Sequence, residues 1–404
     1  MTQKFLKEIE MGSRIALIKK KIVAHYLRNG SSTIPDLAKE LVLSVPTVTK
    51  LIGEMSDDEF LIDYGKLETQ GGRYPNLYGL NPEAGYFVGV EVRTSTINIG
   101  VINFKGEMIS MEMNIPYNFE NTVDGLDNLG SLISASILKS TIDTRKILNV
   151  NVSVCGRVSP DLGSSYTLFN FEERPLSEVL KEKLGYKVTI NNDTRTMCYG
   201  EFTQGCAKGR KNVIFVNVSW GIGIGIIIDG KLYNGKSGFS GEFGHIASFD
   251  NEIICHCGKK GCLETEASGW ALSRKLIERI NNKANSILSE WVMANEGQHI
   301  PLEEIMNAIK KEDTLSIEIM EEVGQKLGKH IAGLINIFNP DLVVVGGTLS
   351  LAEDYLFEPI KTAIRKYSLN LVSRDSEIVL SKLKDKAGVI GSCMVARRRM
   401  FEMV

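Results

Sequence analysis

The stretch from Gly241 to Gly269 reads GEFGHIASFDNEIICHCGKKGCLETEASG and holds three of the seven cysteines in the chain. The three stand at positions 255, 257 and 262, and a histidine precedes the first of them by ten residues. Three thiolates and one imidazole form a ligand set typical of closed, tetrahedral zinc. Four protein ligands leave no position for water, so the sequence predicts a structural zinc site of His245, Cys255, Cys257 and Cys262.

The alternative is that these cysteines are reduced residues of a hydrophobic core. Charged and polar side chains fill much of the segment around them, which is too polar for a core. His256 stands between two of the predicted ligands, and we expect it to point away from the metal.

Further motifs surround this stretch. CGRVSP at 155–160 and NND at 191–193 precede it, and PDLVVVGG at 340–347 follows it. Together with GEFGH, CHCGKKGCLE and ASG, they resemble the signature of the ROK family (repressors, open-reading-frame proteins and sugar kinases). The resemblance covers about residues 84–404 and implies an actin-like ATPase (ribonuclease H-like) α/β fold with two lobes.

The implied ROK domain has a smaller lobe of about residues 84–194 plus a C-terminal helix at about 388–404, and a larger lobe of about 195–387. The hydrophobic pattern independently predicts α/β structure after Asn81. Strands are expected within 85–103, 147–160, 186–193, 211–235 and 337–350, with a long helix at about 315–338. Glycine-rich turns follow several of these strands, which is where α/β proteins bind ligands.

The resemblance also implies a sugar site. In the family's kinases, residues of the matching motifs bind sugar hydroxyls, and carboxylates with amides suit that role because each hydroxyl both donates and accepts. His245 would place one ring nitrogen on the metal and the other on the sugar. The implied sugar-binding residues are Gly156, Arg157, Asn192, Asp193, Glu242, His245 and Glu264.

Two departures bear on catalysis. Asp193 matches the general base of the kinases, but their Asp-x-Gly-Gly-Thr loop is here Glu91-Val92-Arg93-Thr94. Their Gly-Thr-Gly loop is here Ser219-Trp220-Gly221. Since glycines allow the backbone to approach phosphate closely, we expect a sugar sensor and no enzyme. A ROK sugar kinase that uses Asp193 as its base is the alternative.

The N-terminal end is basic. Residues 1–28 carry seven Lys and Arg against two Glu, a net charge of +5. This predicts either a contact with phosphates or a solvated basic helix face. Ile15, Ile18, Ile22 and Tyr26 recur at helical spacing and predict the buried stripe of a helix over Ser13–Asn29.

Two shorter helices are predicted next, at 35–41 with Ser32 or Thr33 as cap, and at about 45–55. Two strands with a Gly-Gly-Arg tip follow. This order is typical of a winged helix-turn-helix, which we assign to residues 1–80, although such a module could also be purely structural. The expected DNA contacts are Thr47, Thr49 and Lys50 on the third helix and Arg73 in the wing.

Composition limits the remaining possibilities. The net charge is −2, and no apolar run reaches the length of a membrane span. The start is too charged for a secretory signal, and the cysteines are not spaced as a disulfide framework, so we expect a cytoplasmic protein. The predicted partners are operator DNA and a sugar or sugar phosphate, with no membrane, in a homodimer or homotetramer. A zinc-stabilised binding protein without DNA activity remains a further alternative.

Overall fold

A computed structural model describes residues 4–66 and 75–401. The chain divides into two compact units. The first unit holds residues up to 152, 171–189 and 393 onward, and the second holds 153–170 and 190–392. The predicted boundary near residue 80 lies inside the first unit, so an independent module of residues 1–80 stays a prediction.

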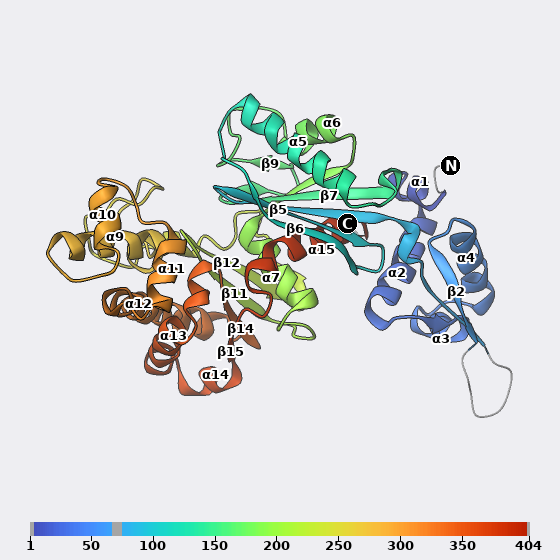
Figure 1. The fold of residues 1–404 in the computed structure, drawn as a ribbon. Helices are drawn as coiled ribbons and strands as arrows, with labels where there is room; N and C mark the ends of the chain where they lie inside the picture. Colours follow the sequence, from blue (N-terminus) through green and yellow to red (C-terminus); the bar gives the residue numbers. More distant parts are fainter. Residues whose placement is uncertain (1–3, 67–74, 402–404) are drawn as a thin grey trace. The chain divides into compact units, whose positions relative to one another are not determined.

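The described chain begins with four helices (Figure 1). Ser13, Thr33 and Ser44 each cap one of them, because their side-chain oxygens accept a hydrogen bond from the N–H three residues later. The three predicted helices are confirmed, and an additional first helix was not predicted. The four helices are α1 (Lys4–Glu10), α2 (Arg14–Asn29), α3 (Ile34–Glu40) and α4 (Val45–Asp57).

The buried face of α2 differs from the predicted stripe. Ile22 and Tyr26 are buried as expected, but Ile15 is 45% exposed. Lys19 is fully buried instead, with its Nζ 2.8 Å from a carboxylate oxygen of Glu8 and 2.9 Å from one of Glu54. Helix α1 supplies Glu8, so the buried side of α2 is the one that faces α1. Lys19 therefore pairs inside the protein and is no cation for phosphates.

A small antiparallel sheet completes this region, in the order β1-β3-β2. The two strands expected for the wing are confirmed as β2 and β3. The predicted wing contact Arg73 lies outside the described residues. The strands are β1 (Ser32–Thr33), β2 (Leu61–Lys66) and β3 (Asn76–Leu80).

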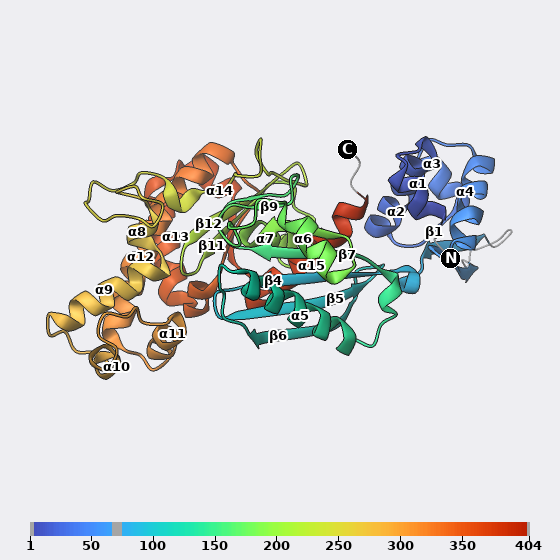
Figure 2. The same ribbon diagram turned by 90° about the horizontal axis from the view of Figure 1, so that it is seen from above.

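The larger sheet of the first unit has the order β10-β7-β4-β5-β6. Its β4, β5 and β6 form an antiparallel meander, and β7 and β10 continue across the unit boundaries. Helices α5 and α6 lie on one face of the sheet (Figures 1 and 2). The elements are β4 (Tyr86–Val92), β5 (Thr96–Asn103), β6 (Met108–Pro116), α5 (Val123–Lys139), β7 (Ile147–Val154), α6 (Leu176–Leu184), β10 (Val188–Asn192) and α15 (Ala387–Phe401), with 3₁₀ turns η1 (Pro82–Ala84) and η2 (Thr144–Lys146).

The second unit is built on the sheet β13-β12-β11-β14-β15, in which β11, β14 and β15 are parallel and β12 is antiparallel to β11. The strands are β8 (Val158–Ser159), β9 (Ser164–Ser165), β11 (Val213–Val218), β12 (Ile222–Ile228), β13 (Lys231–Leu232), β14 (Leu342–Gly346) and β15 (Glu377–Leu380). The helices are α7 (Asp193–Gln204), α8 (Glu264–Ala267), α9 (Gly269–Asn281), α10 (Ser289–Ala294), α11 (Leu302–Lys310), α12 (Thr314–Phe338), α13 (Asp354–Tyr367) and α14 (Asn370–Asp375), with 3₁₀ turns η3 (Phe243–His245), η4 (Thr348–Ala352) and η5 (Lys384–Lys386).

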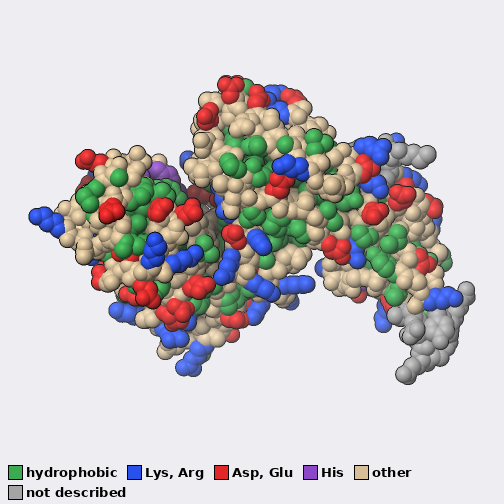
Figure 3. Space-filling view, viewed as in Figure 1, with side chains coloured by type: hydrophobic (Ala, Val, Ile, Leu, Met, Phe, Trp, Pro, Cys, Tyr) green, Lys and Arg blue, Asp and Glu red, His purple; other side chains and the backbone are tan. Residues whose placement is uncertain are grey.

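The predicted α/β class is thus confirmed, as are the predicted strands and the long helix, now α12. On the face shown in Figure 3, acidic and basic side chains are interspersed over the second unit, in keeping with the near-neutral net charge. Among the described residues, the helices are all too short or too polar to cross a bilayer.

Candidate metal centre and effector site

The structure brings the four predicted zinc ligands together. The ligand atoms of His245, Cys255, Cys257 and Cys262 all lie within 4.8 Å of one another. The Cys255 Sγ is 3.6 Å from the His245 Nδ1, and the Cys257 Sγ is 3.7 Å from the Cys262 Sγ. A tetrahedral zinc site with metal–sulfur bonds of about 2.3 Å has edges of about 3.8 Å. The donor set and its spacing therefore fit zinc.

The local backbone explains how the knuckle places its ligands. Isolated bridges join Ala247 to Cys262 and Ile254 to Lys260, and the Cys255 N–H donates to the Lys259 carbonyl. Gly261 has a φ of +72°, and a Cβ there would lie 2.1 Å from the Phe249 carbonyl oxygen. Glycine is required at that turn because any side chain would collide with backbone.

The surroundings shift the pKa values of the three cysteine thiols in different directions. Burial raises the pKa of Cys255 to about 12 and also raises the pKa of Cys262. Burial acts in the same direction on Cys257, but hydrogen bonds from the Lys259 N–H and the neighbouring thiols outweigh it and lower the Cys257 pKa. A bound dication favours the thiolate form of each ligand, so a metal bound at these thiols would release protons.

Glu264 and His256 extend this cluster. Glu264 is 4% exposed, and its two carboxylate oxygens lie 3.0 Å from the His256 Nδ1 and 2.9 Å from the Ile222 backbone nitrogen. The His256 Nδ1 is also 4.0 Å from the Cys255 Sγ. His256 thus lies outside the set of four ligands, as expected, and its ring contacts Glu264. Ligand spacing alone gave no signal for this contact, because its partner follows eight residues later.

His245 faces two ways. Its Nδ1 meets the thiol of Cys255, and its Nε2 lies 3.8 Å from a carboxylate oxygen of Glu242. Glu242 is exposed, and the histidine is partly exposed. One imidazole thus lies between the predicted metal ligands and an accessible carboxylate, and its sharing between a metal and a sugar stays a prediction.

The start of β12 contacts three segments that carry or adjoin the predicted acidic residues. The Ile222 N–H donates to Glu264, and the Ile224 N–H donates to the carbonyl of Gly241, the residue before Glu242. A Cβ at Gly223 would lie 3.0 Å from the Oγ1 of Thr194, the residue after Asp193. The alternating glycines of GIGIG therefore permit close packing on this strand.

A second junction involves Asn192. Its Oδ1 accepts from the Arg195 N–H and so caps α7, while its Nδ2 donates to the Gly156 carbonyl at 3.0 Å. Gly156 has a φ of +80°, and a Cβ there would lie 2.4 Å from the Thr167 Oγ1. The Asp193 Oδ1 accepts from the Asn192 Nδ2 at 2.9 Å. The turn after β7 and the start of α7 therefore form one polar surface.

Arg195 was not predicted as a site residue. It is buried, and its guanidinium donates to the carbonyls of Val158, at 3.1 Å, and Gly238. These contacts tie the turn that carries Gly156 and Arg157 to the loop that leads to Glu242. The sequence did not indicate this role, because an arginine in the first turn of a helix usually faces solvent.

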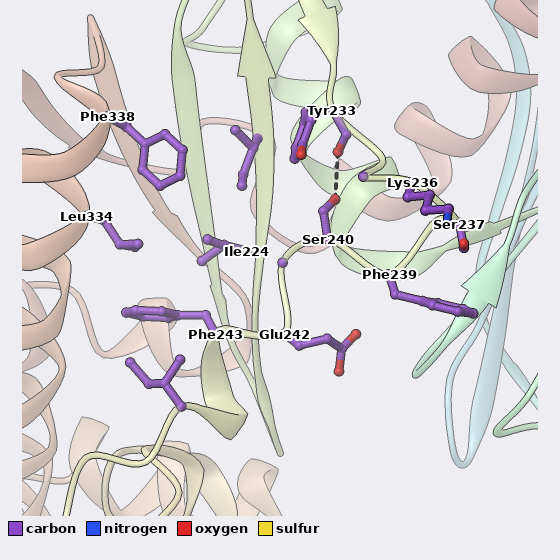
Figure 4. Close-up of a pocket in the computed structure, with 14 residues that line it drawn as sticks. Ile224, Tyr233, Lys236, Ser237, Phe239, Ser240, Glu242, Phe243, Leu334 and Phe338 are labelled. Atoms are coloured by element: carbon purple, nitrogen blue, oxygen red, sulfur yellow. Dashed lines mark hydrogen bonds between the residues drawn. The ribbon is translucent and has the colours of Figure 1, made fainter.

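A cavity of about 530 Å³ opens along the edge of β12 beside this loop (Figure 4). Its lining is largely aromatic and aliphatic, with Glu242 among the polar residues. In Figure 4, Glu242 and Phe239 extend to the same side of the loop, whereas Phe243 points the other way, toward Leu334.

Side chains with defined contacts stand in the two segments that match the kinases' glycine loops. In the first unit, Glu91 is buried, and it accepts from the Arg93 guanidinium at 3.1 and 3.2 Å and from the Asn98 Nδ2 at 2.7 Å. In the second unit, the Trp220 side chain is 42% exposed, and its ring centroid lies 5.5 Å from that of His299. Both segments therefore carry large side chains at positions where the resemblance implies glycines.

On α4 the predicted DNA-contacting residues Thr47, Thr49 and Lys50 are all exposed. The Thr49 hydroxyl donates to the Val45 carbonyl at 2.9 Å, and the Thr47 hydroxyl lies 2.7 Å from that of Ser44. Lys50 is exposed, so its ammonium is hydrated.

Comparison with known proteins now decides the family. Residues 87–399 match the model described as ROK family. The chain belongs to the ROK family. The xylose repressor of Caldicellulosiruptor bescii is 30% identical over 357 residues, which cover 88% of this chain and 89% of the repressor. The glucokinase of Halalkalibacterium halodurans is 29% identical, and the alignment covers 78% of this chain and 96% of the kinase.

A solved structure gives the fold of this ROK protein. The crystal structure of a ROK family transcriptional regulator, described as a homologue of the E. coli Mlc protein, matches with a TM-score of 0.78 at 24% identity. The match covers 95% of this chain and 96% of that one. The predicted ROK fold is confirmed by this likeness. Repressors and glucokinases are both relatives of the chain.

Proposed function

We propose that this ROK protein is a sugar-responsive transcriptional regulator, most simply a repressor of carbohydrate-utilisation genes. The observation that carries the proposal is the alignment with a xylose repressor along nearly the full length of both chains. The glucokinase alignment covers almost all of the kinase but a smaller share of this chain. The four N-terminal helices and their sheet precede residue 87, where the family model begins.

Zinc would be held by His245, Cys255, Cys257 and Cys262 as a structural ion. Bound there, it would supply a cross-link between the short η3 turn and the knuckle, with folding free energy as its contribution. Since Glu264 contacts both Cys255 and the start of β12, a well-ordered knuckle would also fix the position of that carboxylate.

The effector would bind where the polar groups of the second unit converge. Asp193 and Glu242 supply acceptors, Asn192 supplies an amide, and the exposed guanidinium of Arg157 is a donor for hydroxyl or phosphate oxygens. The other proposed sugar-binding residues are Gly156, His245 and Glu264. Glu264 is buried and already hydrogen-bonded. We therefore propose that it either accepts from a sugar hydroxyl at the floor of the site or holds β12 in place.

Phosphoryl transfer is not part of the proposed function. The Glu91–Arg93 pair and the Trp220 side chain occupy the loops that in the family's kinases have glycines. A specific observation favours the kinase alternative: Asp193 stands at the start of α7, its carboxylate accepting the Thr194 N–H at 2.7 Å, which keeps the position expected for a base. The ATP assay described in the Discussion separates the two.

DNA would be read by α4. Its Thr47, Thr49 and Lys50 would enter the major groove, with Arg73 of the wing as a further contact. One recognition helix covers few base pairs, so a homodimer or homotetramer would bind a pseudo-palindrome with half-sites roughly one or two helical turns apart. We propose that the protein binds DNA and sugar in the cytoplasm.

The test is a fluorescence anisotropy titration with labelled DNA from the region upstream of the protein's own gene cluster. A DNA of equal length and shuffled sequence is the control. The proposal expects binding of the upstream DNA to be at least about a thousandfold tighter at physiological salt. Equal affinity for the two DNAs would contradict it.

A further inference from the structure

Two exposed aromatic side chains stand beside the candidate effector site in the second unit. The rings of Tyr166 and Phe239 meet edge to face, with centroids 5.5 Å apart and planes at 77°. Tyr166 is 45% exposed and Phe239 is 42% exposed. Two exposed aromatic rings in contact form an apolar surface on which the apolar face of a ligand can pack.

Each ring belongs to a segment that carries proposed sugar-binding residues. The Tyr166 N–H donates to the Arg157 carbonyl at 2.9 Å, and the next residue, Thr167, packs against Gly156. Phe239 precedes Glu242 by three residues, and the two side chains extend to the same side of their loop (Figure 4). The aromatic pair therefore joins two segments that carry proposed sugar-binding residues and are far apart in sequence.

A cavity adjoins Phe239 and Glu242, although Tyr166, Asn192 and Asp193 do not line it. The cavity of about 530 Å³ that Phe239 and Glu242 line lies within the range of roughly 300–1,000 Å³ that holds drug-sized ligands. A single pyranose is smaller than such a ligand. Exposed Lys236 and Ser237 also line the cavity and offer polar groups for further hydroxyls.

We propose that the effector is a disaccharide or longer oligosaccharide. The polar residues around Asn192, Asp193 and Glu242 would take one ring, and the apolar C–H face of the adjoining ring would pack on Tyr166 and Phe239. A pyranose has a polar rim and an apolar face, so an aromatic wall beside carboxylates suits both parts of it. This inference rests on the proposed function, because it names the ligand class for the same site.

The test is calorimetric titration of the full chain with xylose and glucose, and with xylobiose, cellobiose and maltose. Wild type is compared with Tyr166→Ala, Phe239→Ala and the control Tyr355→Ala, which removes a partly exposed tyrosine from α13. We expect at least one disaccharide to bind more tightly than the monosaccharides. Each site variant should weaken that disaccharide roughly tenfold, a typical effect of one ring-stacking contact.

The outcomes distinguish failure of the oligosaccharide inference from failure of the sugar-sensor function. Monosaccharide affinity should change by less than about twofold in the site variants, and Tyr355→Ala should match wild type. If sugars bind but both site variants keep wild-type affinity for every disaccharide, or lose affinity for both classes equally, the oligosaccharide inference is overturned while the sugar-sensor function stands. If no sugar binds wild type, the proposed function fails, and this inference fails with it.

Discussion

Replacing Lys19 by methionine tests how the N-terminal helices are held together. The Lys19 ammonium is buried between Glu8 of α1 and Glu54 of α4, with its Nζ also 5.9 Å from the Phe5 ring centroid. Lys19→Met leaves two carboxylates facing one another without their cation. Removing one member of a buried ion pair typically costs about 3–5 kcal/mol. The two carboxylates keep some contact with water, so we expect the low end, about 3 kcal/mol.

The assay is hydrogen exchange of backbone amides, followed by mass spectrometry on peptides from α2 and α4. A loss of about 3 kcal/mol in local opening free energy should speed exchange there roughly a hundredfold. Lys21→Met is the matched control, because Lys21 is exposed on the same helix and should leave exchange within about twofold of wild type. The double variant Lys19→Met/Glu54→Gln should recover part of the loss.

The effect should also depend on pH in a defined direction. The hydrogen bond from Lys19 lowers the pKa of Glu54 below its ordinary value of 4.5. A carboxyl with a lowered folded pKa contributes stability above its unfolded pKa and loses it as the pH falls through the folded value. The difference between wild type and Lys19→Met should therefore be complete near neutrality and shrink below about pH 4.5. Identical exchange of α2 in the two proteins at pH 7 would refute this account of the ion cluster.

Three further predictions concern metal, catalysis and DNA. Elemental analysis of protein purified without chelators should find one zinc per chain, Cys257→Ser should lose it, and Cys155→Ser, outside the cluster, should keep it. Sugar-dependent ATP hydrolysis should stay far below about 1 per second, and turnover at that rate would establish the kinase alternative. Lys50→Ala should weaken DNA binding on all sequences and reduce the slope of affinity against salt by up to about one. The control Lys310→Ala on α11 should change neither quantity. An unchanged salt slope for Lys50→Ala would show that Lys50 does not contact a phosphate.

Sequence predicted the parts of the site whose chemistry lies in residue type and spacing. The Cys-x-Cys-x4-Cys pattern with His245 before it has few uses other than metal binding, and the structure brings those four ligand atoms together. The strands around the glycine turns were predictable as well, because continuous apolar runs between turn residues have a clear signal.

Contacts between distant segments could not be predicted. Lys19 was counted with the basic end because nothing local shows that α1 and α4 supply its acids. Ile15 was placed in the core because its spacing fits the stripe, yet the core face of α2 depends on which helices pack against it. Arg195 and His256 likewise acquire their roles from partners that the fold brings near.

The most direct test of the central claim is linkage between sugar and DNA. Anisotropy titrations give the affinity for upstream DNA with and without saturating sugar, and calorimetry gives the affinity for the sugar with and without that DNA. A regulator predicts that sugar changes DNA affinity by a measurable factor, typically about 5- to 150-fold, and that DNA changes sugar affinity by the same factor. Binding of both ligands with no change in either affinity would contradict the proposed function.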